Sequence, residues 1–363
     1  MTGIYVHIPF CERKCNYCAF TSFSSAENTR ENYVDILDSE IKSRADGRKI
    51  NTIYFGGGTP SILSSSQIEK VSNVIKQNFD LSTLEEWTIE ANPNSISEEF
   101  LKTCKKLGIN RISIGVQSLS DTNLKKIGRL HTKDEAIEKI KLAKQYFENI
   151  SVDIIVGLEG ETGEVLCDYA KTLLSLGIKH ISCYLLEVYK NTKIFEMIEK
   201  KEYTPLDDDA QIDAFEKLSD FLQKNGMIRY EISNFAFPGF ESKHNLGYWT
   251  REEYFGFGIS AHSFLGGERI ENAKTLSDYK NGPKKVEKLS DKEILEEIIM
   301  LGLRCNQGAN INSLKELGYD ISKNEYFLQY IKQNILKTEN NKIFLNERFY
   351  DVSNTIISNL LPN

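Results

Sequence analysis

Long apolar runs are missing from this sequence, and so is any strongly basic segment. No stretch of about 18 apolar residues occurs, which argues against a membrane-spanning helix. The first residues, MTGIYVHIPF, have neither the basic start nor the long apolar region of a secretory signal. The net charge is −7, and no block of lysine and arginine stands out. We therefore expect a cytoplasmic protein that binds no nucleic acid.

The cysteine content does not fit a disulfide framework. The sequence has seven cysteines, an odd number, and no predicted signal for secretion. Four of them lie in apolar or helical surroundings, where small buried core residues are expected: Cys104, Cys167, Cys183 and Cys305. The other three, Cys11, Cys15 and Cys18, lie close together in the segment CERKCNYC and need a different explanation.

Short β-rich runs alternate with amphipathic helical stretches over the first 190 residues. Strands are predicted where Ile, Val, Tyr or Thr dominate a run, at 3–8, 50–56, 86–91, 110–116, 150–157 and 179–186. Helices are predicted by apolar spacing at 25–45, with Ser25 as its cap, and at 64–79, 97–108, 134–147 and 161–177. Such alternation indicates a parallel sheet with helices outside, either as a barrel or as an open sheet.

The alternation stops at about residue 207. One long helix is predicted at 207–226, followed by an aromatic, glycine-rich and irregular stretch at 228–265. From about residue 290, helices precede a strand–turn–strand at 335–345 with Asn-Asn at its tip, a pattern typical of a small winged-helix-like domain. The acidic chain and the lack of a basic helix favour a docking or structural role for this domain over DNA binding.

The spacing Cys-x3-Cys-x2-Cys is that of a metal site. A structural zinc site needs four ligands, and no fourth cysteine lies nearby. In a [4Fe–4S] cluster, three thiolates hold three irons and leave the fourth iron open to an external ligand. The loop follows the first predicted strand, where a parallel α/β sheet places its active site. A zinc loop completed by His7, or three unrelated cysteines, are the alternatives.

These cysteines, with Tyr17 before the last, resemble the signature of the radical S-adenosylmethionine (SAM) enzymes. Further motifs, in the same order over most of the chain, resemble the oxygen-independent coproporphyrinogen III oxidase family, and within it the haem-chaperone branch HemW. They are YVHIPFC (5–11), GGGTP (56–60), IEANP (89–93), IGVQS (114–118), DIIVGL (153–158), YEISNFA (230–236) and HNLGYW (244–249).

The resemblance and the alternation together predict the fold. We expect an α/β protein with a partial (β/α)6 TIM-like barrel of the radical SAM type over 1–190. An α/β extension that contains the HNxxYW segment is expected over 191–288, and a small C-terminal winged-helix-like domain over 289–363.

The resemblance also implies a [4Fe–4S] cluster on Cys11, Cys15 and Cys18, with SAM chelating the open iron through its amino and carboxylate groups. Glycines allow close backbone approach, an arginine fork suits a carboxylate, and strand carboxylates suit ribose hydroxyls or an ammonium group. As plain residues, the glycines would form a tight turn and the tyrosines would belong to the core. The implied SAM residues are Tyr5, Tyr17, Gly57, Gly58, Thr59, Glu90, Gln117, Arg129, Asp153 and Ile259.

Haem is the third implied ligand. The resemblance assigns His244, Asn245, Tyr248 and Trp249 to its binding region. Neutral imidazole is a good axial ligand for haem iron, and aromatic rings can stack on a porphyrin. The alternative for this segment is a loop histidine with core aromatics.

Phe20 separates two branches of the family. The oxidase branch carries a further cysteine at this position and a longer N-terminal segment, whereas here only ten residues precede Cys11. Both departures argue against coproporphyrinogen oxidase activity and follow the HemW pattern.

We therefore expect a haem chaperone that can cleave SAM and delivers haem to an acceptor haemoprotein. The alternatives are an oxygen-independent coproporphyrinogen III oxidase or dehydrogenase in porphyrin biosynthesis, and a zinc-stabilised interaction protein. We also expect an electron donor as a partner, and we hypothesise a cluster-dependent homodimer and peripheral contact with a membrane.

Overall fold

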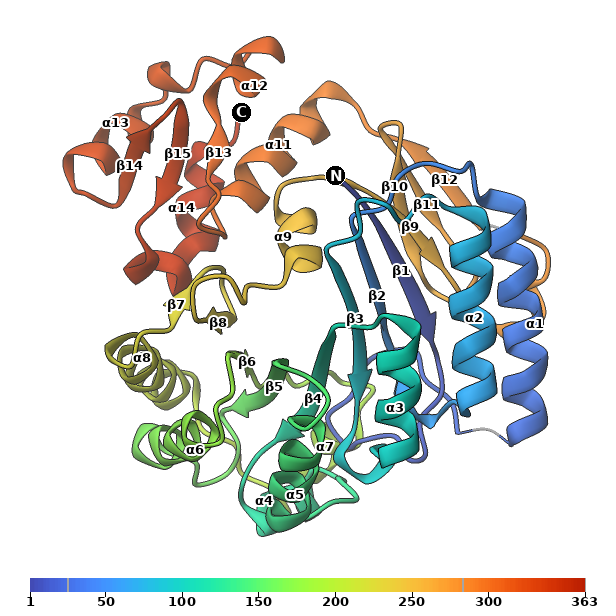
Figure 1. Cartoon of the computed structure of the whole chain (residues 1–363). Helices are drawn as coiled ribbons and strands as arrows, with labels where there is room; N and C mark the ends of the chain where they lie inside the picture. Colours follow the sequence, from blue (N-terminus) through green and yellow to red (C-terminus); the bar gives the residue numbers. More distant parts are fainter. Residues whose placement is uncertain (25, 283, 363) are drawn as a thin grey trace.

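One twelve-stranded sheet forms the frame of the molecule, which we describe from a computed structural model covering residues 1–24, 26–282 and 284–362. The strands follow the order β12-β11-β10-β9-β1-β2-β3-β4-β5-β6-β8-β7, and the two end strands are not paired with each other within the described residues. The sheet curves into an arc with helices on its outer side (Figure 1). This is a partial barrel, as the sequence predicted.

The centre of the sheet is parallel. Its neighbouring strands are β9 (Glu253–Phe257), β1 (Thr2–Ile8), β2 (Thr52–Gly57), β3 (Glu86–Ala91), β4 (Arg111–Gln117), β5 (Asn149–Val156) and β6 (His180–Leu185). Antiparallel strands extend both sides: β10 (His262–Leu265), β11 (Glu268–Glu271), β12 (Lys285–Lys288), β8 (Asn234–Ala236) and β7 (Ile228–Arg229). The six predicted strands are confirmed to within a few residues.

The stretch 228–265 differs from the sequence prediction, which treated it as irregular. It contains β9, and β9 pairs in parallel with β1 in the centre of the sheet. Two glycines hide the pattern: an added Cβ at Gly256 would lie 1.8 Å from the carbonyl oxygen of His262, and Gly258 has a φ of +102°. The structure needs glycine at both positions because only glycine tolerates that approach and that angle.

Helices cover the outer face of the parallel strands, as the alternation predicted. They are α1 (Glu27–Arg44), α2 (Ser65–Asn78), α3 (Glu98–Leu107), α4 (Asp121–Lys126), α5 (Lys133–Ala143), α6 (Gly163–Ser175), α7 (Lys193–Glu199) and α8 (Asp208–Lys224), with the short α9 (Lys243–Trp249) and α10 (Leu276–Tyr279) further on. Ser64 and Gln67 form a capping box that fixes the start of α2. The predicted cap at Ser25 lies outside the described residues.

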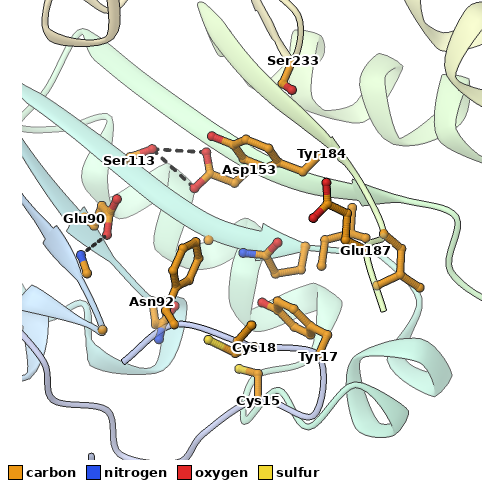
Figure 2. A pocket seen from close by; sticks show the side chains of 18 of the residues that line it. Cys15, Tyr17, Cys18, Glu90, Asn92, Ser113, Asp153, Tyr184, Glu187 and Ser233 are labelled. Atoms are coloured by element: carbon orange, nitrogen blue, oxygen red, sulfur yellow. Dashed lines mark hydrogen bonds between the residues drawn. The ribbon is translucent and has the colours of Figure 1, made fainter. Parts of the chain in front are cut away.

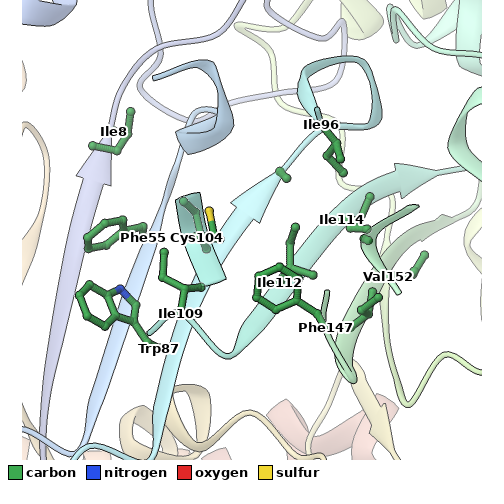
Figure 3. Packing of buried hydrophobic residues seen from close by; sticks show 14 of the residues in the cluster. Ile8, Phe55, Trp87, Ile96, Cys104, Ile109, Ile112, Ile114, Phe147 and Val152 are labelled. Carbon is green, nitrogen blue, oxygen red and sulfur yellow. The ribbon is translucent and has the colours of Figure 1, made fainter. Parts of the chain in front are cut away.

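Strand residues alternate between the two faces of the sheet. Ile112 and Ile114 of β4 pack against the helices, together with Phe55 and Trp87 of the neighbouring strands (Figure 3). The residues between them on each strand point into the arc and are mostly polar or aromatic, for example Ser113. The core therefore lies between sheet and helices, and the inside of the arc is left for a polar site.

The C-terminal part has a core of its own. Its elements are α11 (Asp291–Gly302), β13 (Ala309–Asn310), α12 (Ile311–Glu316), α13 (Glu325–Lys332), β14 (Leu336–Glu339), β15 (Lys342–Leu345) and α14 (Ser353–Leu360), with sheet order β13-β15-β14. Asn340 and Asn341 form the hairpin tip with φ values of 48° and 61°. Asparagine tolerates these left-handed angles, which explains the tip of the predicted hairpin. Helices followed by this hairpin, in the sheet β13-β15-β14, form the winged-helix-like arrangement that the sequence predicted.

This C-terminal part contacts both sides of the open arc. On one side, Arg229 of β7 pairs with Asp351 at 2.9 Å. On the other side, Arg251, just after α9, pairs with Glu297 of α11 at 2.9 Å, and Arg269 of β11 pairs with the same carboxylate. Figure 1 shows α11 above α9, and α14 just above β7. The gap in the ring is therefore spanned by the C-terminal part.

Within the described residues, none of the helices combines the length and the apolar character that crossing a bilayer requires.

Replacement of Ile112 by alanine tests the position of the core. Ile112 is fully buried between sheet and helices. We expect Ile112→Ala to lower the free energy of unfolding by about 2–5 kcal/mol in urea denaturation followed by circular dichroism. The control is Val286→Ala on β12, where the side chain is 57% exposed and the change should stay within about 0.5 kcal/mol. Equal losses in the two variants would contradict this assignment of the core.

Candidate functional site

A cavity of about 810 Å³ lies inside the arc, at the carboxyl ends of the parallel strands. Its lining combines the cysteine loop after β1 with inward-facing residues of β3, β4, β5 and β6 and with the loop after β7. Figure 2 shows Cys15 and Cys18 at one end of the cavity, Asp153 and Glu90 along its wall, and Ser233 at the far end. Parallel sheets place their active sites at this edge.

The cysteine loop is closed at its base and held in its middle by the segment that follows α4. At its base, the amide of Cys11 donates to the carbonyl of Phe23 at 3.0 Å. In its middle, the amide of Asn16 donates to the carbonyl of Ile127 at 2.9 Å, and the guanidinium of Arg13 donates to the carbonyl of Gly128 at 2.7 Å. Ile127 and Gly128 follow α4, so the loop is held between the ends of β1 and β4.

The three thiols line the cavity and are all half-buried. The hydroxyl of Thr59 donates to Cys11 Sγ at 3.5 Å, and a guanidinium nitrogen of Arg129 donates to Cys15 Sγ at 3.3 Å. Burial raises the pKa of the Cys11 and Cys18 thiols, and the Thr59 hydrogen bond partly offsets this for Cys11. These donors suit thiolates that ligate a metal.

The donor set fits a [4Fe–4S] group. In such a cluster, three thiolates bind three separate irons and leave the fourth iron open. Three thiols line the cavity, and hydrogen-bond donors lie beside Cys11 and Cys15. Among the described residues, no three His, Cys, Asp or Glu side chains are grouped so that they could hold one metal ion.

The GGGTP loop packs directly on the cysteine loop. The amides of Gly58 and Thr59 donate to the carbonyls of Ile8 and Phe10, both at 2.8 Å. An added Cβ at Gly58 would lie 2.7 Å from the Phe10 carbonyl oxygen, and one at Gly57 would lie 2.5 Å from the His7 ring. The glycines are thus required for this close packing, and the loop backbone lines the cavity beside Cys11.

Arg129 and Gln117 meet at the end of β4. Besides Cys15, the guanidinium of Arg129 contacts the carbonyl of Gly115 and the Oδ1 atom of Asn92, the latter at 2.7 Å. Its Nε atom is buried and has no hydrogen-bond partner among the residues that the structure describes. Gln117 follows a bulge and has a φ of 72°, an unfavourable angle for this residue. The strand end is thus distorted where it borders the cavity, and Arg129 keeps an unused donor.

Glu90 and Asp153 are the carboxylates of the inner wall. Glu90 accepts hydrogen bonds from the Tyr54 hydroxyl at 2.8 Å and the Gly57 amide at 3.0 Å, and Asp153 accepts from the Ser113 hydroxyl at 3.2 Å (Figure 2). Burial, with a smaller contribution from the charge of Asp153, raises the pKa of Glu90 to about 7. Burial also raises the pKa of Asp153. The wall therefore offers carboxyl groups to polar or cationic ligand groups.

The remaining predicted SAM residues differ in position. Tyr5 and Tyr17 line the cavity: the Tyr5 hydroxyl lies 3.0 Å from His7 Nδ1, and Tyr17 packs on a small cluster that contains Ile127. Ile259 is 1% exposed, and it is not among the described residues that line the cavity; its amide donates to the Tyr33 hydroxyl behind β1 at 3.1 Å. The structure therefore brings nine of the ten predicted residues to one cavity.

The HNxxYW segment lies at the other end of the strands. It forms α9, whose first amides, those of Lys243 and His244, donate to the buried carboxylate of Glu86 at 2.9 and 3.2 Å. His244 Nδ1 bonds the hydroxyl of Thr52 at the start of β2. The five steps along the strand from Thr52 to Gly57 span roughly 16 Å. The segment therefore closes the amino end of the ring, away from the thiols.

Both ring nitrogens of His244 are engaged. Nδ1 lies 2.8 Å from the Thr52 hydroxyl, Nε2 lies 2.8 Å from the Tyr248 hydroxyl, and the ring stacks on Tyr54 with centroids 5.2 Å apart. Burial, aided by the positive charge of Arg111, lowers the pKa of His244 to about 3. Asn245 and Trp249 are half-buried. In this conformation the neutral imidazole can reach an iron only if one of its hydrogen bonds breaks.

Sequence reasoning missed several residues of the interior. Arg111 of β4 is 2% exposed inside the ring, and Arg229 and Asp351 line the cavity from β7 and from the C-terminal part. A charged residue within a β-rich run was the available signal for Arg111. Nothing in the sequence links Arg229 with Asp351, because their contact depends on how the C-terminal part packs.

The partial barrel and the loop of three thiols define a protein of the radical SAM class, and the sequence profile described as "Radical SAM superfamily" matches residues 5–173, from β1 into α6. "Heme chaperone HemW" of Lactococcus lactis subsp. lactis (strain IL1403) is 36% identical over 98% of this chain and 96% of its own length. "Heme chaperone HemW" of Bacillus subtilis (strain 168) is 37% identical over 85% of both chains. The chain therefore belongs to the HemW family within the radical SAM superfamily, which confirms the resemblance.

A solved structure supports the fold. Coproporphyrinogen III oxidase (HemN) from Escherichia coli, described as a radical SAM enzyme, superposes with a TM-score of 0.85 over 99% of this chain and 90% of that chain. At 20% sequence identity, this similarity concerns the architecture alone.

The titration of Glu90 gives a testable pH dependence. Its pKa is 4.5 for an ordinary glutamate and about 7 in the folded chain, so the folded state binds more protons between these values. Stability contributed by the protonated carboxyl is therefore lost as the pH rises from about 4.5 to about 7. Relative to Glu90→Gln, the free energy of unfolding of the wild-type apoprotein should fall by roughly 2 kcal/mol between about pH 5 and pH 8, at about 1.4 kcal/mol per pKa unit. Urea titrations at several pH values measure it, and parallel curves for the two proteins would contradict it.

Proposed function

We propose that this protein binds haem and transfers it to an acceptor haemoprotein, and that it carries a [4Fe–4S] cluster and SAM. The observation that carries the proposal is a single cavity that joins three cysteine thiols to nine of the residues implied for SAM, in a chain whose relatives over nearly its whole length are named heme chaperones. The cavity of about 810 Å³ is in the size range of small-molecule and cofactor sites.

Cys11, Cys15 and Cys18 would hold the cluster, and the adjoining wall would hold SAM. The backbone of Gly57, Gly58 and Thr59 borders the thiols and can approach the methionine end closely. Arg129, with its unused Nε donor, suits a carboxylate. On the opposite wall, Glu90 and Asp153 can accept hydrogen bonds from hydroxyl or ammonium groups.

When bound, the cluster supplies the electron that radical SAM chemistry requires. The chain's own residues hold the ligands and limit the access of water. Tyr17 and the thiols form one enclosed end of the cavity, and Phe20 lies at its open side with 71% of its side chain exposed. A phenyl ring offers no thiol at this position, which supports haem handling over coproporphyrinogen oxidation.

The cellular setting is part of the same proposal. We propose a cytoplasmic protein that receives electrons from a donor protein and delivers haem to an acceptor haemoprotein. A cluster-dependent homodimer is the assembly we propose, and identical elution of the protein with and without cluster in anaerobic size-exclusion chromatography would count against it.

One anaerobic preparation tests the function. We expect the reconstituted protein to contain iron and sulfide, to bind haem in a spectroscopic titration, and to form no protoporphyrinogen from coproporphyrinogen, SAM and reductant. Cys15→Ala should lose the cluster while its circular dichroism stays unchanged, because the core lies outside the ring. Cys104→Ala is the matched control. Cys104 lies in that core, so its replacement should leave the cluster intact. Turnover of coproporphyrinogen would support the oxidase alternative, and zinc without iron would support the interaction-protein alternative.

His244 is proposed as a haem ligand that must first release Tyr248 or Thr52. His244→Ala should weaken or alter haem binding, spare the cluster, and lower the free energy of unfolding by about 1–3 kcal/mol because two buried hydroxyls lose their partner. His244→Gln, whose amide can bond both hydroxyls, should recover part of the stability but not the haem spectrum. An unchanged haem spectrum in the glutamine variant would leave His244 with a structural role only.

A further inference from the structure

Arg229 lies in the wall of the cavity but has no part in the cluster or SAM sites. It ends β7, and its side chain is 3% exposed. Its guanidinium stacks 4.5 Å from the ring centre of Phe215 and 5.2 Å from that of Tyr350. Aromatic faces on both the barrel and the C-terminal side therefore orient a desolvated cation at the edge of the cavity.

The hydrogen bonds of Arg229 point the guanidinium at one carboxylate. Its Nε and Nη2 atoms donate to the carbonyl of Ile232 at 3.0 and 2.6 Å, which fixes the plane of the group. Nη2 and Nη1 then donate to the two carboxylate oxygens of Asp351 at 2.9 and 3.4 Å. This is the fork geometry in which arginine binds carboxylates. Arg229 is thus already arranged as a carboxylate site.

Asp351 comes from a different part of the molecule. It belongs to the 3-10 helix Glu347–Val352 of the C-terminal part, and its side chain is 18% exposed. Both Asp351 and Arg229 line the cavity, so a ligand there can reach the pair from inside. The longer of the two hydrogen bonds, at 3.4 Å, marks the weaker half of the fork.

Other parts of the cavity lining are apolar. Large side chains that line the cavity and remain exposed are Phe20 (71%), Tyr184 (44%), Leu185 (40%) and Tyr189 (46%). Exposed apolar groups of this number in one cavity are typical of a ligand site. A flat apolar molecule with a peripheral carboxylate can pack on side chains of this kind and present its charge to Arg229.

We propose that Arg229 binds a carboxylate of the ligand, and that the ligand carboxylate replaces Asp351. The inference rests on the proposed function, in which the ligand is a tetrapyrrole with propionate groups. Exchange of one carboxylate for another leaves the buried guanidinium paired throughout, so no uncompensated charge arises. Once replaced, Asp351 no longer ties the 3-10 helix to β7. Ligand binding is thereby coupled to the seating of the C-terminal part.

The coupling is local. Other contacts across the same junction do not involve Arg229: the Asn306 amide donates to the Tyr230 carbonyl at 2.8 Å, and Glu231 and Cys305 form a backbone bridge. These bonds keep the C-terminal part attached when Asp351 is released. The expected change is a loosened segment 347–352 and not a detached domain.

Two porphyrins that differ only in whether their carboxylates are free test the contribution of the carboxylate to binding. The probes are iron mesoporphyrin with free propionates and its dimethyl ester, titrated into the full-length protein. Arg229→Gln should weaken binding of the free acid on the order of tenfold, the scale of a charge-assisted hydrogen bond, and leave the ester unchanged. Asp351→Asn should tighten binding of the free acid by a similar factor, because a competing carboxylate is removed. Arg269→Gln, which breaks an ion pair with α11 away from the cavity, is the matched control and should change neither affinity.

Hydrogen exchange follows the coupled segment. Free-acid iron mesoporphyrin should raise amide exchange in segment 347–352 of the wild type, whereas the ester should not. Equal shifts for acid and ester in Arg229→Gln, or unchanged affinities in both Arg229→Gln and Asp351→Asn, would overturn the assignment while leaving haem binding intact. If the wild type binds neither porphyrin, the proposed function and the assignment of Arg229 both fail. If Arg229→Gln does not fold, Asp351→Asn alone decides, and an unaltered preference for acid over ester refutes the exchange.

Discussion

The alternation of side chains along the parallel strands is the constraint on which the rest of the structure depends. Every second residue packs against the outer helices, as Ile112 and Ile114 do, and this fixes the residue between them, Ser113, inside the ring. Because the strands run parallel, their carboxyl ends meet at one edge, and the loops that follow them share one space. The thiols, the GGGTP loop and the strand carboxylates meet there although they lie far apart in the sequence. The chemistry of the cavity is thus a consequence of the packing behind it.

The polar groups inside the ring need hydrogen-bond partners, and a chain of contacts that runs from the amino end of the strands to the carboxyl end provides them. At the amino end, Glu86 accepts the first amides of α9 and so closes the ring with a short helix. One level further, Tyr54 stacks on His244 and donates to Glu90. Glu90 in turn accepts the amide of Gly57 beside the thiols. The HNxxYW segment and the cavity are therefore linked by contacts through the centre of the ring, although they lie at opposite ends of β2.

Much of this could be predicted from the sequence, and the exceptions have physical causes. The six strands and their helices follow from local apolar spacing, and the cysteine loop follows from its own motif. The strand β9 escaped prediction because Gly256 and Gly258 interrupt its pattern. Gly256 is required by the close approach of His262 on the next strand, and Gly258 by contacts with His7 and Tyr33, which lie far away in the sequence. The pair of Arg229 and Asp351 joins residues separated by 122 positions, and no local pattern encodes such a contact. The position of His244 likewise depends on Thr52 and Glu86, which a motif alone does not reveal.

The unpaired ends of the sheet have a consequence for its dimensions. In a closed barrel, the number of strands and their stagger set the diameter, and no side chain can alter it. Here the ends β12 and β7 are not paired with each other within the described residues, and the C-terminal part spans them through the ion pairs of Asp351 and Glu297 and the backbone contacts of Cys305 and Asn306. The width of this ring therefore depends on how the C-terminal part packs, and not on strand number and stagger alone. Substitutions in that part can change the size of the chamber during evolution while the hydrogen bonds between the central strands stay as they are.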